Sequence, residues 1–241
     1  MELKDIDINF DFQTDSYSPR NPTKLRDPDY YSKTLRHYHK LIYSKLLPNG
    51  QFMELTEDPY SYLKWDGLRF GSDSIIASFR YSYYQWMHDK LRHELQDYDK
   101  YIQDYLHKAY TLGGEIIFSI PGKGWSMNQA RGCLRKISDR FDLTLECIRR
   151  YYSKEDSPLS KAINNSHAFF DLFQNFQGYV EFFFLEDLCS SDFSKVNLWL
   201  DNDNFQKSAL PQTPKEYRDF IEKELEFVKR RNLRISKFCN N

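Results

Sequence analysis

The segment SMNQARGCLRKISDRFDLTLECIRRYY, Ser126–Tyr152, carries the clearest pattern in this chain of 241 residues. Wound on a helix of about 3.6 residues per turn, it places six apolar side chains in one narrow arc that we expect to face the core: Leu134, Ile137, Phe141, Leu145, Ile148 and Tyr152. Gly132 is costly inside a helix, and Leu143 falls on the polar side. The segment is therefore either one helix or two helices with a break near Phe141 and Asp142.

The opposite face of this segment is a polar stripe with basic groups at both ends and carboxylates between them. Mg²⁺ and Mn²⁺ take oxygen ligands, so the carboxylates are candidate metal-binding or catalytic groups: Asp139, Asp142 and Glu146. The flanking side chains are candidates for binding a phosphate: Asn128, Arg131, Arg149 and Arg150. The alternative is a solvated surface of ion pairs, because Arg135 and Asp139, like Glu146 and Arg150, are four residues apart.

The loop before this segment adds a further candidate. The apolar run EIIFSI, residues 115–120, predicts a buried strand, and PGKGW follows it directly before the helix. A strand, a glycine loop and a helix start is an arrangement in which backbone N–H groups can bind an anion, so Lys123 joins the ligand-binding candidates. The glycine spacing matches neither the Walker motif nor GxGxxG, and an ordinary surface turn is the alternative.

The rest of the chain predicts a mainly α, α+β fold with a small sheet of three to five short strands. DIDINFDF, residues 5–12, alternates apolar and polar residues and predicts a strand. Helices are expected after Pro28, from a cap at Ser72 or Asp73, and over Tyr98–Tyr110. Further helices are expected after Ser157-Pro158 and after Thr213-Pro214.

Composition indicates one globular domain over residues 1–241, with residues 228–241 as a basic segment that could be appended to it. Gly and Pro number nine each, and no stretch of them divides the chain. The net charge of −1 argues against a general nucleic-acid binder. The four cysteines form no CxxC, no signal peptide is visible and no apolar run reaches 18 residues, which predicts a cytoplasmic protein without a membrane partner.

Several strings resemble a family of uncharacterised, single-domain bacterial proteins, a domain of unknown function. DRFDLTLECIRRYY, residues 139–152, is the most specific, and GGEIIFSIPGKG and FFDLFQNFQGYVEFF, residues 113–124 and 169–183, support it. The resemblance spans most of the chain and implies a bacterial protein with one domain. It brings no activity, cofactor or partner. This chain reads IIFSIP where the family usually has a proline directly after IIF.

Two functional hypotheses follow from these patterns. In the first, the protein binds or acts on a phosphate-bearing ligand, a nucleotide or a nucleic acid, with a Mg²⁺ or Mn²⁺ ion on the central carboxylates. In the second, it is a non-enzymatic module that binds another protein through the aromatic run Tyr81, Tyr83, Tyr84 and Trp86 or through the basic C-terminal segment. No GxSxG elbow and no HExxH motif is present.

Overall fold

A four-stranded antiparallel sheet in the order β3-β4-β5-β6 forms the centre of the computed structural model. Its strands are β3 (Thr56–Glu57), β4 (Leu63–Trp65), β5 (Leu68–Ser74) and β6 (Glu115–Ser119). The structure describes residues 2–18, 21–59, 61–76, 89–90, 92–94 and 96–241. A separate two-stranded sheet consists of β1 (Tyr17–Ser18) and β2 (Asn21–Leu25).

Helices supply most of the remaining secondary structure. The α-helices are α1 (Pro28–Tyr31), α2 (Lys33–Tyr43), α4 (Tyr98–Ala109), α5 (Met127–Cys133), α6 (Phe141–Tyr152), α7 (Ser160–Asn165), α8 (His167–Asp171), α9 (Phe176–Phe182) and α10 (Pro214–Cys239). The 3-10 turns are η1 (Leu3–Asp5), η2 (Phe12–Asp15), η3 (Leu112–Gly114) and η4 (Glu186–Leu188). The prediction of a mainly α, α+β single domain with a small sheet is confirmed.

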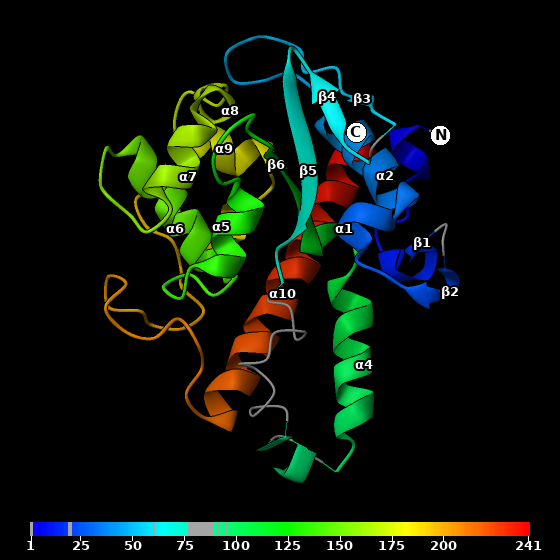
Figure 1. Ribbon diagram of the computed structural model, residues 1–241, viewed down its shortest axis with the longest axis vertical. Coiled ribbons are helices and arrows are strands. Elements are labelled where there is room, and N and C mark those ends of the chain that lie inside the picture. The colour runs from blue at the N-terminus through cyan, green and yellow to red at the C-terminus, as the bar shows by residue number, and fades with distance from the viewer. Residues whose placement is uncertain (1, 19–20, 60, 77–88, 91, 95) are drawn as a thin grey trace.

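The helices lie on both sides of the sheet, as Figure 1 shows. α5 to α9 gather on one side of β5 and β6, whereas α1 and α2 lie on the other. The long helix α10 runs past the sheet and packs against α4 and η3. Gly113 permits this approach, because a Cβ there would lie 2.2 Å from the Val228 carbonyl oxygen. Val228, Arg231 and Ile235 are buried, so the basic end of the chain is part of the domain's core helix.

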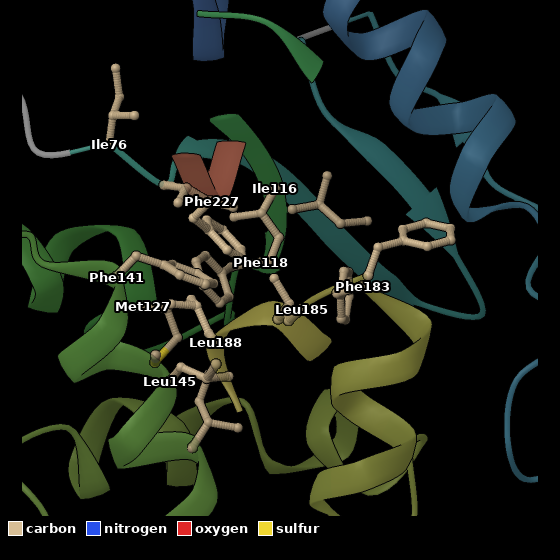
Figure 2. Packing of buried hydrophobic residues seen from close by; sticks show 14 of the residues in the cluster. Ile76, Ile116, Phe118, Met127, Phe141, Leu145, Phe183, Leu185, Leu188 and Phe227 are labelled. Atoms are coloured by element: carbon tan, nitrogen blue, oxygen red, sulfur yellow. The ribbon is translucent and has the colours of Figure 1, made fainter. Parts of the chain in front are cut away.

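The core is rich in aromatic rings and continuous between the sheet and the helices. Figure 2 shows Met127, Phe141 and Leu145 from α5 and α6 gathered beside Phe118 of β6. All four side chains are fully buried. Buried rings each remove roughly 150–250 Å² from water, so burial of these residues fixes the position of α5 and α6 on the sheet.

Capping residues in the sequence predict most helix starts correctly. Ser126 caps α5 and exchanges hydrogen bonds with Gln129, and the Thr213 hydroxyl accepts from the Glu216 N–H at the start of α10. The segment Ser126–Tyr152 is two helices rather than one, with residues 134–140 between them. Ser138 and Asp139 in this connection have φ values of 48° and 63°, which an α-helix does not allow.

Two secondary-structure predictions are wrong. The alternating segment 5–12 is not a strand, because residue 5 ends the 3-10 turn η1 and residue 12 begins the 3-10 turn η2. Of its apolar residues, Phe12 alone is fully buried. Ser72 and Asp73 do not cap a helix, because both lie in β5, where they pair with Ile117 and Ile116 of β6. The expected helix after them falls largely on residues 77–88, outside the described residues.

Candidate functional site

The predicted carboxylate Asp142 lies at the start of α6 and is fully buried in an ion pair. Arg140 Nε donates to Asp142 Oδ1 at 3.0 Å and Arg140 Nη2 to Oδ2 at 2.5 Å. The Trp199 N–H also donates to Oδ2 at 2.8 Å. The same guanidinium donates to the carbonyls of Leu200 and Ala209. Asp142 therefore fastens α6 to the segment around residue 200, and its oxygens are occupied.

The predicted carboxylate Glu146 lies one turn further along α6, between two arginines. It accepts hydrogen bonds from Arg149 Nε at 2.8 Å, Arg149 Nη2 at 2.9 Å and Arg150 Nε at 2.8 Å. Burial alone would raise the pKa of Glu146, but the hydrogen bonds from both arginines lower it below its usual range. The three side chains line a hollow of about 430 Å³ with Lys195, Asn202 and Phe205.

The predicted carboxylate Asp139 faces a third location, the buried guanidinium of Arg131. Arg131 Nη2 lies 3.5 Å from Asp139 Oδ1, Nη1 binds Asp73 of β5, and Nε donates to Thr144 Oγ1 at 3.1 Å. Burial alone would lower the pKa of Arg131, but the charges of Asp73 and Asp139 raise it above its usual value. Arg131 is therefore an internal counter-ion of an acidic cluster and is not open to a ligand.

The three predicted carboxylates thus lie in three different environments. Lys123 is exposed on the loop between β6 and α5, whereas Arg149 and Arg150 lie on α6. Within the described residues, no group of three or more His, Cys, Asp or Glu side chains is arranged to hold a metal ion. The left-handed turn at Ser138 and Asp139 breaks the single helix that the helical wheel assumed. Asp142 and Glu146 both lie on α6, but they bind different arginines.

The use of two surfaces for a protein partner stays a prediction, and Lys229, Arg230 and Lys237 of the basic segment are exposed. The aromatic run Tyr81, Tyr83, Tyr84 and Trp86 lies outside the described residues. In the basic segment Arg231 is buried, and Arg234 Nε donates to Asp187 Oδ2 at 2.5 Å.

The pairing of β5 with β6 instead brings together an acidic cluster that the sequence did not single out. The register places Ser74 opposite Glu115 and Asp73 opposite Ile116, and α1 packs against β5 with Asp29. Asp29, Asp73, Glu115 and Asp139 interact electrostatically around this point. Segments from four separate parts of the chain contribute, which is why no local motif announces the cluster.

Asp29 and Glu115 form a carboxyl pair at the centre of the cluster. Glu115 is fully buried, and it interacts electrostatically with the side chain of Asp29. Neither Glu115 oxygen has a hydrogen-bond partner among the residues that the structure describes. A buried carboxyl without a donor favours its neutral form, because burial disfavours the charge. Burial, followed by the charges of neighbouring carboxyls, holds the pKa of both well above the usual range.

Asp73 and His39 extend this set of titratable groups. Burial raises the pKa of Asp73 to about 7, even though the Arg131 charge acts to lower it. His39 of α2 is fully buried, with Nδ1 3.0 Å from Ser72 Oγ. Burial, together with the charge of Arg231, lowers the pKa of His39 to about 3, so its ring is neutral at pH 7. His39 therefore stays neutral at pH 7, whereas the carboxyl of Asp73 can gain or lose a proton near that pH.

A pocket of about 370 Å³ opens beside the carboxyl pair. It lies between α1, β5 and the loop that leads from β6 into α5, and Asp29, Ser72 and Asn128 form its polar wall. Asn128 Nδ2 donates to the Ser72 carbonyl at 2.9 Å, which fixes the amide. Its Oδ1, like Asp29 Oδ1, is buried and has no hydrogen-bond donor among the described residues. Tyr30 and Tyr62 line the same pocket.

Sequence reasoning found Asn128, Arg131 and Asp139, and it missed Asp29, Asp73, Glu115 and His39. One signal was present: Glu115 is the only charged residue in EIIFS, the strand in which all five residues are buried. A buried charge in an apolar strand is rare unless it is paired, so Glu115 required a partner. The partner Asp29 lies 86 positions earlier in the sequence, and no spacing rule connects the two.

The comparisons with known proteins identify a family and no function. A model of the family of unknown function DUF6994 matches residues 6–235, and the chain belongs to this family. This confirms the resemblance to an uncharacterised single-domain family. Neither a curated protein nor a solved structure matches the chain. Within the described residues, every helix is too short or too polar to span a bilayer.

Proposed function

We propose that this DUF6994 chain binds a small ligand rich in hydrogen-bond donors in the pocket beside Asp29, and exchanges a proton with it. The observation that carries the proposal is the buried carboxyl of Glu115, which has no hydrogen-bond partner among the described residues and interacts with Asp29 of the pocket wall. We infer that these two carboxyls share a proton. A buried carboxyl costs free energy unless it is paired or neutral. Active sites are where such arrangements cluster, because a shifted pKa suits proton transfer near neutral pH.

The unpartnered atoms of the pocket indicate which ligand groups fit. Asn128 Oδ1 and Asp29 Oδ1 both accept hydrogen bonds, and both are buried without a donor from the described residues. A buried acceptor left without a donor costs about 1–3 kcal/mol, which a ligand hydroxyl or amino group would recover. Ligands of this kind include sugars and nucleosides, and the rings of Tyr30 and Tyr62 offer apolar surface to a base or a sugar face.

A nucleotide is the version of this ligand that also includes a phosphate. The carboxyls of Asp29 and Asp73 would repel a phosphate placed deep in the pocket, so its place would be at the mouth. Lys123 is exposed there, in the loop whose neighbours Pro121 and Gly124 line the pocket. The family resemblance and the free thiols at all four cysteines favour a bacterial, cytoplasmic setting as part of this proposal.

The experiment is a thermal-shift screen of the full chain at pH 7 with nucleosides, nucleotides and small sugars, followed by calorimetry of any hit. We expect a hit to lose at least tenfold in affinity in Asp29→Asn, which removes the exchangeable proton and keeps the shape. Glu146→Gln, in the other hollow, is the matched control and should bind normally. Equal binding by wild type and Asp29→Asn, or weakening only in Glu146→Gln, would refute the proposal.

A second candidate function rests on the hollow at Arg149 and Arg150. Two guanidinium groups, each about one-sixth exposed, bind Glu146, Arg149 also lies 3.4 Å from Glu155, and Lys195 lines the same hollow. This leaves an excess of positive charge around a concave surface, which suits the phosphate-bearing ligand expected from the sequence. Asn204 holds Arg150 in place, and Arg150 also stacks over the ring of Phe205 with 4.9 Å to its centroid.

Binding of inorganic phosphate and of nucleotides to Arg150→Gln tests this candidate. We expect Arg150→Gln to bind these ligands more weakly than wild type. Binding should also weaken with added salt, because screening reduces the attraction between exposed charges. Lys161→Gln, which removes one exposed positive charge elsewhere, is the control. Loss of binding to the same extent in both variants would show a nonspecific charge effect and would exclude this hollow.

A further inference from the structure

The hollow at Arg149 and Arg150 lies between α6 and the irregular connection from η4 to α10, drawn in orange next to α6 in Figure 1. Asp203, Asn204 and Phe205 in this connection have φ values of 45°, 56° and 63°. A left-handed backbone is costly for residues other than glycine, so side-chain contacts must hold this turn. Arg150 supplies two such contacts, because it binds Asn204 Oδ1 and lies over the ring of Phe205.

Arg150 keeps unused N–H groups in this hollow. A guanidinium carries five N–H donors. Nε donates to Glu146 at 2.8 Å, Nη1 to the Asp156 carbonyl at 3.4 Å, and Nη2 to Asn204. Two of the five donors therefore have no acceptor among the described residues. Lys195, which is exposed, lines the same hollow and adds a second cation.

Asn202 adds a hydrogen-bond acceptor to the hollow, which it also lines. The residue is 1% exposed, and its Nδ2 donates to the Lys207 carbonyl at 3.1 Å. Exchanging the nitrogen and oxygen of this amide would set two carbonyl oxygens against each other, so the contact fixes which atom is Oδ1. That Oδ1 is buried and has no donor among the described residues. An N–H or O–H group of a ligand would remove the cost of leaving it unpaired.

Apolar side chains form much of the remaining wall. They are Leu143 of α6 and, from the connection, Val196 and Leu198. A volume of about 430 Å³ lies within the range of small-molecule sites, which combine apolar walls with a few polar groups. A matching ligand has an anionic group for Arg150, an apolar body, and an edge that donates a hydrogen bond to Asn202.

We propose that this hollow selects a nucleoside monophosphate whose base carries an exocyclic amino group, as adenine and cytosine do. The inference rests on the second candidate function, the binding of a phosphate-bearing ligand at Arg150. The phosphate accepts from the unused N–H groups of Arg150 and from Lys195, the base lies against the apolar wall, and its amino group donates to Asn202 Oδ1. Hypoxanthine and uracil carry a carbonyl oxygen in place of that amino group, and two acceptors would then face each other.

Calorimetry of the full chain at pH 7 tests this selection with AMP against IMP and CMP against UMP. The members of each pair share the phosphate and the sugar and differ at the amino position. A site built to accept from an N–H group rejects an analogue that lacks it, because its buried oxygen stays unpaired. We expect the amino-bearing member of the tighter-binding pair to exceed its partner in affinity at least tenfold, and inorganic phosphate to displace both.

Two variants separate the amino group from the phosphate. Asn202→Ala removes the acceptor and should bring the two affinities of that pair to within about twofold of each other. Lys195→Gln, the matched control, removes an exposed charge from the same hollow. It should weaken both members to the same extent and leave their ratio unchanged.

The possible failures are distinguishable. Equal affinities within both pairs, with phosphate still displacing the nucleotides, would overturn the amino-group selection and leave phosphate binding intact. A preference that persists in Asn202→Ala protein with native circular dichroism would overturn the role of Asn202. No binding of any nucleotide or of phosphate would overturn the second candidate function together with this inference.

Discussion

Two buried acidic sites in this chain have opposite hydrogen-bonding states. Asp142 is fully buried, yet its oxygens receive two N–H groups from Arg140 and one from the backbone of Trp199. Glu115 is equally buried, and its contact is another carboxyl, that of Asp29. Both sites hold ionisable groups in the interior, and the number of N–H donors around them is what differs.

Under the proposed function, this difference separates a structural charge from a functional one. A buried carboxylate with a full set of donors stabilises one arrangement of the chain and has nothing left to offer a ligand. A buried carboxyl that must keep a proton can release it when the surroundings change, and its burial lowers the free energy of unfolding. The Arg140–Asp142 pair belongs to the first kind, and the Asp29–Glu115 pair beside its pocket to the second.

The largest effect is expected from breaking the satisfied pair. Arg140→Met leaves Asp142 as a buried charge without a partner, which should lower the free energy of unfolding by about 3–5 kcal/mol in urea denaturation. The double variant Arg140→Met, Asp142→Leu removes both charges and should recover most of that loss. A single variant within 1 kcal/mol of wild type would contradict the structural role of the pair.

The next effect concerns the unsatisfied pair and depends on pH. Folded Asp29, Glu115 and Asp73 keep protons that unfolded carboxyls lose above about pH 4. The folded state therefore binds more protons between about pH 4 and 7, so these groups make the free energy of unfolding fall as pH rises through that window. Asp29→Asn should match wild type in stability at pH 4 and exceed it at pH 8.

Urea denaturation of both proteins at several pH values measures this difference. Asp187→Asn, which affects an ion pair with Arg234 far from the cluster, serves as the control and should not gain stability as pH rises. A difference between Asp29→Asn and wild type that stays constant from pH 4 to pH 8 would show that the pair shares no proton.

A smaller effect is expected at the pocket wall. Asn128→Ala removes the hydrogen bond from Nδ2 to the Ser72 carbonyl at 2.9 Å, which should cost about 1 kcal/mol in thermal or urea unfolding. The same change deletes the unpartnered Oδ1, so a ligand of the pocket should bind more weakly as well. Loss of stability with full retention of binding would remove Asn128 from the site.

The smallest effect sets the baseline for the comparison. Arg230 and Glu226 form an exposed pair one helical turn apart, with 2.8 Å between Nε and Oε1. Arg230→Gln should leave the urea midpoint of unfolding almost unchanged, because solvent and salt screen such pairs. A clear drop in that midpoint would mean that surface charge, rather than burial, dominates the stability of α10.

The sequence allowed local structure to be predicted where a local cause exists. Ser126 and Thr213-Pro214 mark helix starts, and the run of apolar residues 115–120 marks the buried strand β6. The alternation of apolar and polar residues in segment 5–12 predicted a strand wrongly, because such a pattern forms a strand only if a neighbouring strand is available to pair with it. Segment 5–12 has no such partner among the described residues, and it forms turns.

The site could not be predicted in the same way, because its members are neighbours only after the sheet has formed. Asp139, Asp142 and Glu146 are close in sequence, but a left-handed turn and three different partners separate their side chains. Asp29 and Glu115 are distant in sequence, and the packing of α1 on β5 joins them. Charge spacing along a helix therefore predicted one set of carboxylates, whereas the packing of the fold brings together a largely different set.

The hydrogen bonds that Arg231 donates to the start of β6 have a consequence for when the domain can fold during its synthesis. From α10, its guanidinium donates to the carbonyls of Gly113 and Glu115 at 2.9 and 2.7 Å, and to that of Phe183 at 3.0 Å. A nascent chain emerging from the ribosome has already released Asp29 and Glu115 long before Arg231 appears. The start of β6 lacks this anchor until synthesis reaches α10, so we expect the proton-sharing pair to assemble only when translation of the domain is nearly complete.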